Sequence, residues 1–328
     1  MQLYTLENDH LKITLSDFGA SWLSCIVKLP NEQREVLVTT TPERWQKQTA
    51  YFGATVGRYA NRIANGCYRL NDKEFILARN NGENNLHGGE LGADKQLWQV
   101  ESASLQAVRL SKKFANGEEG FGGEVNATVE YRLNGNQLEI EFNAQSDQDT
   151  PLCFTNHAYF NLSNAPTIHQ HELQLNADYY LPVGSNGIPN APLKAVEGTS
   201  FDFRKRKKIG QDLLTDADQQ AVRGYDHAFR LAKHCQDLTA CQPDATLSAG
   251  GITLELRTTK PALQVYTGNW LGGQPNLTGG SYPDYAGVAL EPEFFPDTPN
   301  HPEWWKIGGI TRAGETYRHR IHYCFKTA

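Results

Sequence analysis

A histidine stands within a strand-like stretch of the sequence, LCFTNHAYFNLSN, at residues 152–164. Read with a period of two, apolar side chains alternate with side chains that carry hydrogen-bonding groups, and His157 falls on the polar side. That side offers an imidazole, a phenol and an amide, whereas Lys, Glu and Thr are more usual on a face that only meets water. His157 is therefore either a polar filler of a sheet or a group that transfers a proton.

Four other segments combine residue types that could bind a polyhydroxylated ligand. Each also has an ordinary structural explanation, such as an ion pair or a turn, but together they offer imidazole, carboxylate, guanidinium and amide groups. These segments are FGATVGRYANRIANG (52–66) with Arg58, Asn61 and Arg62, NNGENNLHGG (80–89) with His87, GYDHAF (224–229) with Asp226, and GVALEPEFFPDTPNHPEW (287–304) with Glu291 and Glu293.

Other chemistries have weak support or none. The sequence contains no phosphate-binding Walker loop, no GxGxxG, no GxSxG and no HExxH motif. The pair His169 and His171 could present two imidazoles on one strand face, but no third ligand is near in sequence, so an exposed strand is favoured over a metal site. The basic run at 204–208 is interpreted as a solvated loop. With a net charge of −6, the chain is not expected to bind nucleic acid.

The elements that must position these side chains are mostly strands. The segment 124–146 predicts a hairpin, with a turn at Asn134-Gly135-Asn136 between two alternating runs. Only 41–48 and 211–222 favour short helices. Many short strands, 29 glycines and 15 prolines predict an all-β fold, a large antiparallel β-sandwich with few short helices. No repeat or linker is evident, so we expect a single domain over residues 1–328.

The remaining features indicate the class of protein. No run of about 18 apolar residues is present, so no membrane partner is expected, and the N-terminal segment lacks the pattern of a secretory signal. The six cysteines form no CxxC pair and are interpreted as reduced core residues. These observations predict a cytoplasmic protein.

Seven segments resemble, in their order and in their residues, the aldose 1-epimerases (galactose mutarotases) of bacterial type. The resemblance spans residues 53–304 and so covers nearly the whole chain. It implies a β-supersandwich with a sugar site on its concave face, and an isomerase without a cofactor or metal that interconverts the α and β anomers of free hexoses such as D-galactose and D-glucose. The segments are GRYANRIANG, LHGG, TNHAYFNL, GTSFDFR, GYDHAF, LQVYTGNWLGG and LEPEFFPDTPNHPEW.

The resemblance also assigns roles to individual residues. His157 matches the general acid, Glu291 the general base, and His87 a second histidine near the ring oxygen. Glu293 remains an alternative base on physical grounds, because residues two apart on a strand face the same side. The residues that match those holding the sugar are Asn61, Arg62, Asp226 and Gln264.

The chemistry of ring opening requires this kind of set. A hemiacetal opens when the anomeric hydroxyl loses a proton and the ring oxygen gains one, and a carboxylate with an imidazolium can perform both transfers. Three alternatives remain: glycoside hydrolysis by two carboxylates, epimerisation of a hexose 6-phosphate, and sugar binding without catalysis, with Trp270 as a stacking platform. A phosphorylated substrate would require several Arg or Lys residues, and only Arg58 and Arg62 are candidates.

Overall fold

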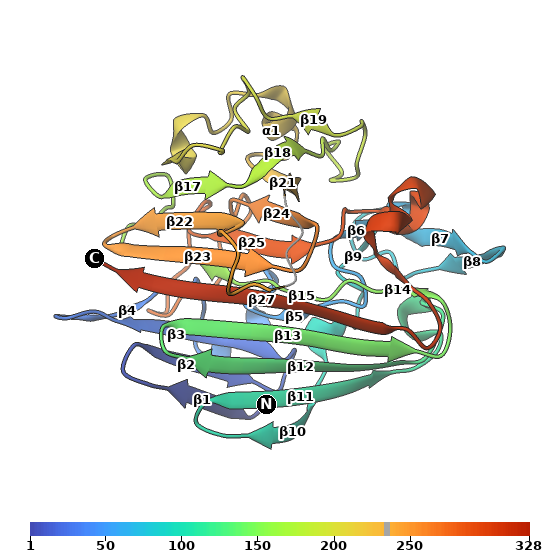
Figure 1. The fold of residues 1–328 in the computed structure, drawn as a ribbon, viewed down its shortest axis with the longest axis horizontal. Helices are drawn as coiled ribbons and strands as arrows, with labels where there is room; N and C mark the ends of the chain where they lie inside the picture. The colour runs from blue at the N-terminus through green and yellow to red at the C-terminus, as the bar shows by residue number, and fades with distance from the viewer. Residues whose placement is uncertain (233–236) are drawn as a thin grey trace.

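The computed structural model describes residues 1–232 and 237–328, which form a predominantly antiparallel β-structure (Figure 1). Its largest sheet has nine strands and runs across the front of the molecule in Figure 1. In spatial order these are β10 (Gln99–Ala103), β11 (Ala107–Phe114), β12 (Val125–Asn134), β13 (Gln137–Ser146), β27 (Thr316–Thr327), β23 (Ile252–Thr258), β22 (Ala245–Ala249), β17 (Glu172–Leu175) and β20 (Lys207–Lys208).

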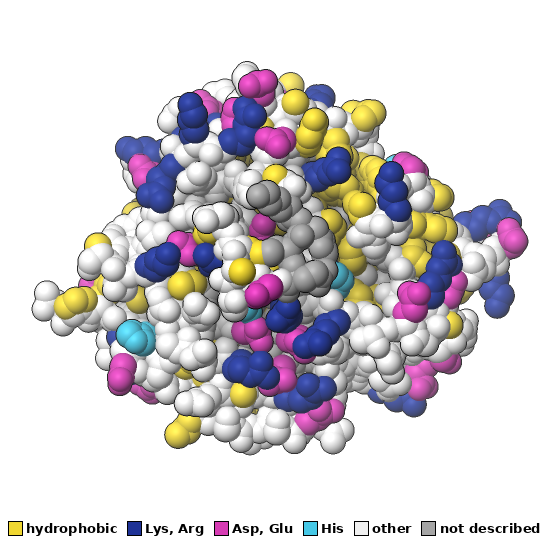
Figure 2. Space-filling view, in the orientation of Figure 1, with side chains coloured by type: hydrophobic (Ala, Val, Ile, Leu, Met, Phe, Trp, Pro, Cys, Tyr) yellow, Lys and Arg dark blue, Asp and Glu magenta, His cyan; other side chains and the backbone are white. Residues whose placement is uncertain are grey.

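The long strands form because apolar and polar side chains alternate along them. In β12 the apolar positions are buried and the others are exposed or half-buried. The turn falls within the predicted Asn134-Gly135-Asn136 segment: Asn134 pairs with Gln137, and Gly135 between them has φ of 55°. This confirms the predicted hairpin. The outward face of the nine-stranded sheet carries charges of both signs side by side (Figure 2), among them Arg318 at 2.8 Å from Glu141 on the neighbouring strand.

A second sheet has six strands and a third has four. The six-stranded sheet consists of β16 (Tyr159–Phe160), β25 (Val288–Glu293), β24 (Ala262–Tyr266), β21 (Asp226–Leu231), β18 (Ala177–Tyr180) and β19 (Lys194–Ala195). The four-stranded sheet consists of β1 (Leu3–Glu7), β2 (Leu11–Ser16), β3 (Ser21–Lys28) and β4 (Gln33–Glu35). Two-stranded pairs complete the structure: β5 (Thr55–Val56) with β15 (Thr155–Asn156), β6 (Arg62–Ile63) with β9 (Asn85–Leu86), β7 (Cys67–Leu70) with β8 (Lys73–Ile76), and β14 (Thr150–Pro151) with β26 (Ile310–Thr311).

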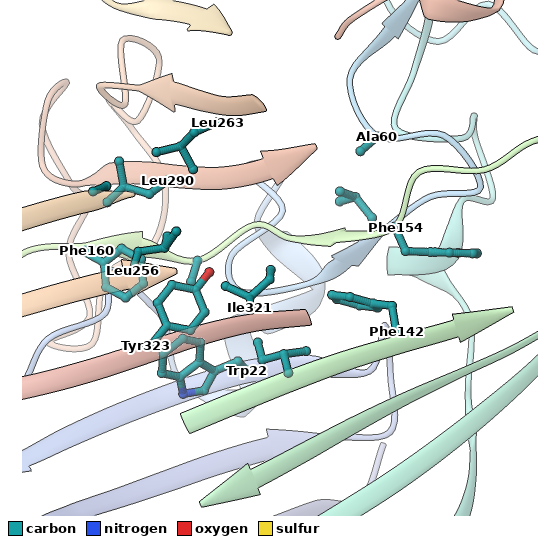
Figure 3. Packing of buried hydrophobic residues seen from close by; sticks show 14 of the residues in the cluster. Trp22, Ala60, Phe142, Phe154, Phe160, Leu256, Leu263, Leu290, Ile321 and Tyr323 are labelled. Carbon is teal, nitrogen blue, oxygen red and sulfur yellow. The ribbon is translucent and has the colours of Figure 1, made fainter. Parts of the chain in front are cut away.

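The main core lies between these layers (Figure 3). Leu263 and Leu290 of the six-stranded sheet, Ile321 and Tyr323 of β27 and Trp22 of β3 belong to one continuous cluster of buried side chains. Burial of apolar area on this scale is the main stabilising contribution to such a fold. The predicted antiparallel β-sandwich is confirmed.

Helices are short, as expected. The segment 41–48 contains the 3₁₀ helix η1 (Pro42–Lys47), and 211–222 contains the only α-helix in the described part of the chain, α1 (Ala217–Ala221). No helix among residues 1–232 and 237–328 has the length and apolarity needed to cross a membrane. The other 3₁₀ helices are η2 (Ala64–Gly66), η3 (Ala93–Lys95), η4 (Glu118–Gly120), η5 (Ile209–Gln211), η6 (Thr298–Asn300) and η7 (Pro302–Ile307).

Two sequence-based expectations for local structure were wrong. The stretch 152–164 is not one strand but two short ones, β15 and β16, and almost all of it is buried on both sides because it runs between the layers. His169 and His171 do not lie on an exposed strand. His169 is in a turn, and His171 is buried, with its Nε2 accepting a hydrogen bond from the Leu162 N–H at 2.8 Å.

The expectation of reduced cysteines holds for four of the six. Cys25, Cys67, Cys153 and Cys324 are free, and three of these are buried. Cys241 is disulfide-bonded, which corrects the expectation for that residue. Cys235 lies outside the described residues.

Candidate active site

A pocket of about 220 Å³ opens between the loops and the six-stranded sheet. This volume is below the roughly 300–1,000 Å³ typical of sites for larger ligands, so it suits a molecule the size of one sugar. All seven residues that the sequence predicts for the site line it: Asn61, Arg62, His87, His157, Asp226, Gln264 and Glu291.

Three adjacent strands supply the polar floor of the pocket. Gln264 on β24 lies directly opposite Glu291 on β25, and Asp226 begins β21 on the other side of β24. Gln264 Nε2 donates to Asp226 Oδ1 at 2.6 Å, and Arg62 Nη1 lies 3.9 Å from Asp226 Oδ2. The Asp226 carboxylate is therefore held from two sides, while the Gln264 carbonyl oxygen is buried without a hydrogen-bond partner.

His87 is fixed by the backbone of Asn61. The Asn61 N–H donates to His87 Nδ1 at 3.1 Å, and the His87 N–H donates to the Asn61 carbonyl oxygen at 3.1 Å. Both residues have positive φ, 66° and 53°, which turns the two loops toward each other. Because Nδ1 accepts a hydrogen bond, neutral His87 carries its proton on Nε2.

His157 faces the carboxylate of Glu291. His157 Nε2 lies 3.5 Å from Glu291 Oε2, and both side chains are almost completely buried. The His157 ring packs 4.9 Å from Tyr159 and 5.2 Å from His87, measured between ring centroids. His157 Nδ1 and Glu291 Oε2 have no hydrogen-bond partner, and buried polar atoms of this kind are uncommon unless a ligand completes them.

Burial determines the electrostatics of this group. It lowers the pKa of His157 to about 4 and holds the pKa of His87 well below its usual value, where His157 and Arg62 lower it further. Burial also raises the pKa of Glu291 well above its ordinary value, and repulsion from Glu293 and Asp226 adds to that rise while Arg62 opposes it. All three groups therefore favour their uncharged forms in this buried environment.

The structure separates the two candidate bases. Glu291 lines the pocket, whereas Glu293 does not. Glu293 is completely buried behind the pocket, where its Oε1 accepts a hydrogen bond from Asn61 Nδ2 at 2.9 Å. The two side chains share one side of β25, as their spacing indicates, but only Glu291 has access to a ligand.

Arg58 does not belong to the pocket. Its guanidinium is buried and donates to the carbonyl oxygens of Gly122 and Gly123 and to the Thr150 hydroxyl. It therefore ties a loop to the core, which leaves Arg62 as the cationic side chain among the described residues that line the pocket.

Sequence reasoning missed several lining residues. Tyr51, Tyr266 and Gln274 contribute to the wall, and nothing in their local sequence marks them except that Tyr266 lies within the segment containing Gln264. Tyr51 packs against His87 at 4.7 Å between ring centroids. Trp270 stands at the rim with 61% of its surface exposed, where the Arg223 guanidinium lies 4.0 Å above its ring.

One group of side chains in the described part of the chain could share a metal ion. His87, His157 and Glu291 each offer one donor atom, and these atoms lie within 4.8 Å of one another. They are the same three groups that face the pocket, so an ion and a sugar would compete for them. Among the residues described, His169 and His171 do not form such a group with a third ligand.

Fold and site together define a class: a large antiparallel β-sandwich that presents an acid/base pair in a pocket suited to a hydroxyl-rich ligand. A protein-family model described as aldose 1-epimerase matches residues 2–324. The chain is 46% identical to the aldose 1-epimerase of Haemophilus influenzae, covering 99% of this chain and 96% of that protein. It is 43% identical to the aldose 1-epimerase of Escherichia coli, covering 99% and 95%.

Structural similarity agrees with these relationships. An aldose epimerase homologue from C. elegans superimposes with a TM-score of 0.91 at 28% identity, covering 100% of this chain and 99% of that one. The chain belongs to the aldose 1-epimerase family. It has the galactose mutarotase-like fold, and its activity is that of an aldose 1-epimerase, an isomerase.

Proposed function

We propose that His157 and Glu291 transfer the protons that open and reclose the ring of a free hexose. The observation that carries this proposal is the 3.5 Å separation of His157 Nε2 and Glu291 Oε2 inside the pocket. Glu291 takes the proton of the anomeric hydroxyl, and His157 gives a proton to the ring oxygen, so the bond between C1 and the ring oxygen breaks. After rotation of the aldehyde group, both transfers run in reverse and the other anomer forms.

The proton count of the pair supports this scheme. An imidazolium with a carboxylate holds the same number of protons as an imidazole with a carboxylic acid. Ring opening converts the first state into the second, which burial of the two side chains favours. The cycle therefore needs no net proton exchange with water, and the uncharged pair is ready to close the open chain.

The remaining polar groups suit the hydroxyls of a hexose. We assign Asn61, Arg62, Asp226 and Gln264 to substrate binding and His87 to the ring oxygen beside His157. Gln264 Oε1 is buried without a partner and lines the pocket, so a sugar hydroxyl would satisfy it. His87 presents its protonated Nε2 as a donor, because Nδ1 is occupied by the Asn61 N–H.

Free hexoses are favoured over hexose phosphates. Arg62 is the cationic side chain that lines the pocket, and it already faces the Asp226 carboxylate. A dianionic phosphate needs several cationic donors, and the described pocket lining offers one that already faces Asp226.

We also propose that residues 1–328 form one domain, because one continuous core cluster contains side chains from Leu6 to Phe325.

A cytoplasmic location is supported by the four free thiols, which a reducing compartment preserves, and opposed by the disulfide at Cys241. Cell fractionation tests the location.

The deciding experiment is polarimetry on freshly dissolved α-D-galactose and α-D-glucose in buffer that contains a chelator. We expect the protein to accelerate the approach to the same final rotation that the sugar reaches alone. Equal acceleration with and without chelator supports acid/base chemistry by the side chains. Acceleration only with a hexose 6-phosphate contradicts the proposed substrate, and binding without acceleration favours a sugar-binding protein.

A further inference from the structure

The His157 imidazole lacks the hydrogen bond that usually orients a proton-transferring histidine. In such sites the ring nitrogen that does not meet the substrate commonly donates to a carboxylate or a carbonyl oxygen, and this bond fixes the ring. His157 Nδ1 is buried and has no hydrogen-bond partner among the described residues, while Nε2 lies 3.5 Å from Glu291 Oε2. Packing against neighbouring rings therefore has to fix the orientation of this imidazole.

The Tyr51 ring packs against both histidines of the pocket. Its centroid lies 4.7 Å from that of His87, with the ring planes at 62°, and 5.6 Å from that of His157, with the planes at 30°. The two imidazoles are themselves 5.2 Å apart at 81°. Aromatic rings attract one another at separations of roughly 4.5–7 Å. Each of the three rings therefore restricts the tilt of the other two.

The segment that carries Tyr51 is bonded to the backbone of His157. The Gly53 N–H donates to the His157 carbonyl oxygen at 2.9 Å, and the His157 N–H donates to the Ala54 carbonyl oxygen at 2.9 Å. The Ala54 N–H in turn donates to the Tyr51 carbonyl oxygen at 3.0 Å. These bonds hold the backbones of the two ring-bearing residues in a fixed relation.

Tyr51 also has an unusual backbone conformation. Its φ is 58°, in the left-handed region that large side chains seldom occupy. Such a conformation persists only where surrounding contacts maintain it, and residues of this kind cluster at functional sites. The contacts of the Tyr51 ring with the two histidines are of that kind.

The hydroxyl of Tyr51 is not needed for this packing. It forms no hydrogen bond with another described residue, and the half-buried side chain lines the pocket. The ring and the hydroxyl can therefore be tested separately, because phenylalanine keeps the first and lacks the second.

We propose that Tyr51 is a positioning residue that orients the His157 imidazole by ring packing, in place of a hydrogen bond to Nδ1. This inference rests on the proposed role of His157 in proton transfer. It requires a flat ring at position 51 and no hydroxyl, and it makes the contribution of Tyr51 one to turnover rather than to sugar binding.

The test compares Tyr51→Phe with Tyr51→Leu by polarimetry over a range of α-D-galactose concentrations. Tyr51→Leu should lower kcat about 10- to 100-fold, the scale of a proton donor misplaced by about 1 Å. KM should stay within about threefold, because no contact to the sugar is removed. Tyr51→Phe should restore kcat to within about threefold of wild type, since the ring is kept. Tyr51→Met, which is large but not flat, takes the place of the leucine variant if that variant does not fold.

A matched control is Phe75→Leu. Phe75 is half-buried like Tyr51, and its ring stacks on Tyr68 with 4.8 Å between centroids. Neither of these two residues lines the pocket. Phe75→Leu removes an aromatic contact of similar separation, so it should lower Tm as Tyr51→Leu does, while kcat and KM stay at their wild-type values.

Two results overturn the inference. If Tyr51→Phe lost as much turnover as Tyr51→Leu, the hydroxyl and not the ring would be the group that matters. If Tyr51→Leu raised KM and left kcat unchanged, Tyr51 would be a sugar-binding residue. His157→Gln is measured alongside: retained turnover in that variant contradicts the proposed function, whereas collapse there with wild-type turnover in Tyr51→Leu contradicts this inference alone.

Discussion

The histidine and glutamate that face each other in the pocket are the proposed proton carriers of the reaction. His157→Gln and Glu291→Gln each remove one proton carrier while keeping a polar side chain of similar reach. We expect kcat to fall about 10²–10⁴-fold in each variant, the usual contribution of one positioned acid or base. The measurement is polarimetry on α-D-galactose, with the spontaneous rate subtracted.

Binding should respond much less than turnover. The hydroxyl contacts from Asp226 and Gln264 are untouched by either substitution, so galactose affinity measured by calorimetry should stay within about tenfold. The double variant should lose little more than the worse single variant, because the two groups act in one coupled step. Near wild-type turnover in His157→Gln would remove that residue from the proton transfer.

At this scale the sequence indicated part of the site. The seven residues predicted for it were identifiable because they stand in distinctive segments of the family pattern, and all of them line the pocket. Glu291 and Glu293 could not be separated, because a period of two places both on one side of a strand and only packing decides which is covered.

At the scale of elements, the loop that carries His87 depends on a glycine. Gly88 has φ of 92°, and a Cβ built there would lie 1.9 Å from the Gly57 carbonyl oxygen. Gly88→Ala must therefore displace the backbone that turns His87 toward Asn61. We expect a loss of kcat of at least tenfold together with a lower Tm, since the sterically allowed alternatives all move the loop.

Gly82 provides the matched control in the same loop. Its φ is 61° and a Cβ there would meet nothing within 4 Å. Gly82→Ala therefore shares the cost of a left-handed backbone, about 1 kcal/mol, without the collision. If both variants lost activity equally, backbone strain rather than the contact with Gly57 would explain the result. Circular dichroism melts and polarimetry on both variants distinguish these outcomes.

The elements themselves were predictable where one side met solvent. The β12–β13 hairpin alternates cleanly because its outer face is exposed, and its boundaries follow from the sequence. The stretch 152–164 does not follow the rule. It crosses the interior, where the Asn156 side chain donates a hydrogen bond to the Gly53 carbonyl oxygen at 2.7 Å. Polar residues in this stretch therefore form buried hydrogen bonds and do not face solvent.

At the scale of the whole molecule, the layered sheets bury several histidines. His171 and His227 are buried outside the pocket, whereas the buried His157 lines it. Burial lowers the pKa of His157 and His171 to about 4 and that of His227 to about 3. The fold therefore holds them uncharged at pH values where the unfolded chain binds protons.

The sign of the effect on stability follows from linkage. Because the folded pKa values lie below the unfolded value of about 6.5, the stabilisation is complete above pH 6.5 and is lost as the pH falls toward 4. Across that window, each such histidine lowers the free energy of unfolding by about 1.4 kcal/mol for every unit by which the pH falls. Buried carboxyl groups act in the opposite direction, because burial raises their pKa, and in the described part of the chain they outnumber the buried histidines: Glu35, Asp94, Asp226, Asp244, Glu291, Glu293 and Asp297.

The prediction is therefore made for one histidine: we expect the contribution of His171 to the free energy of unfolding to be lost as the pH falls from 6.5 to about 4. His171 isolates the effect from catalysis, because it lies outside the pocket and its Nε2 accepts the Leu162 N–H. His171→Gln should be less stable at pH 7.5, where the imidazole packs best, yet lose less stability on acidification. The exposed His10→Gln provides the control. Urea unfolding at several pH values measures both, and parallel curves for His171→Gln and wild type would show that burial of this imidazole does not drive acid unfolding.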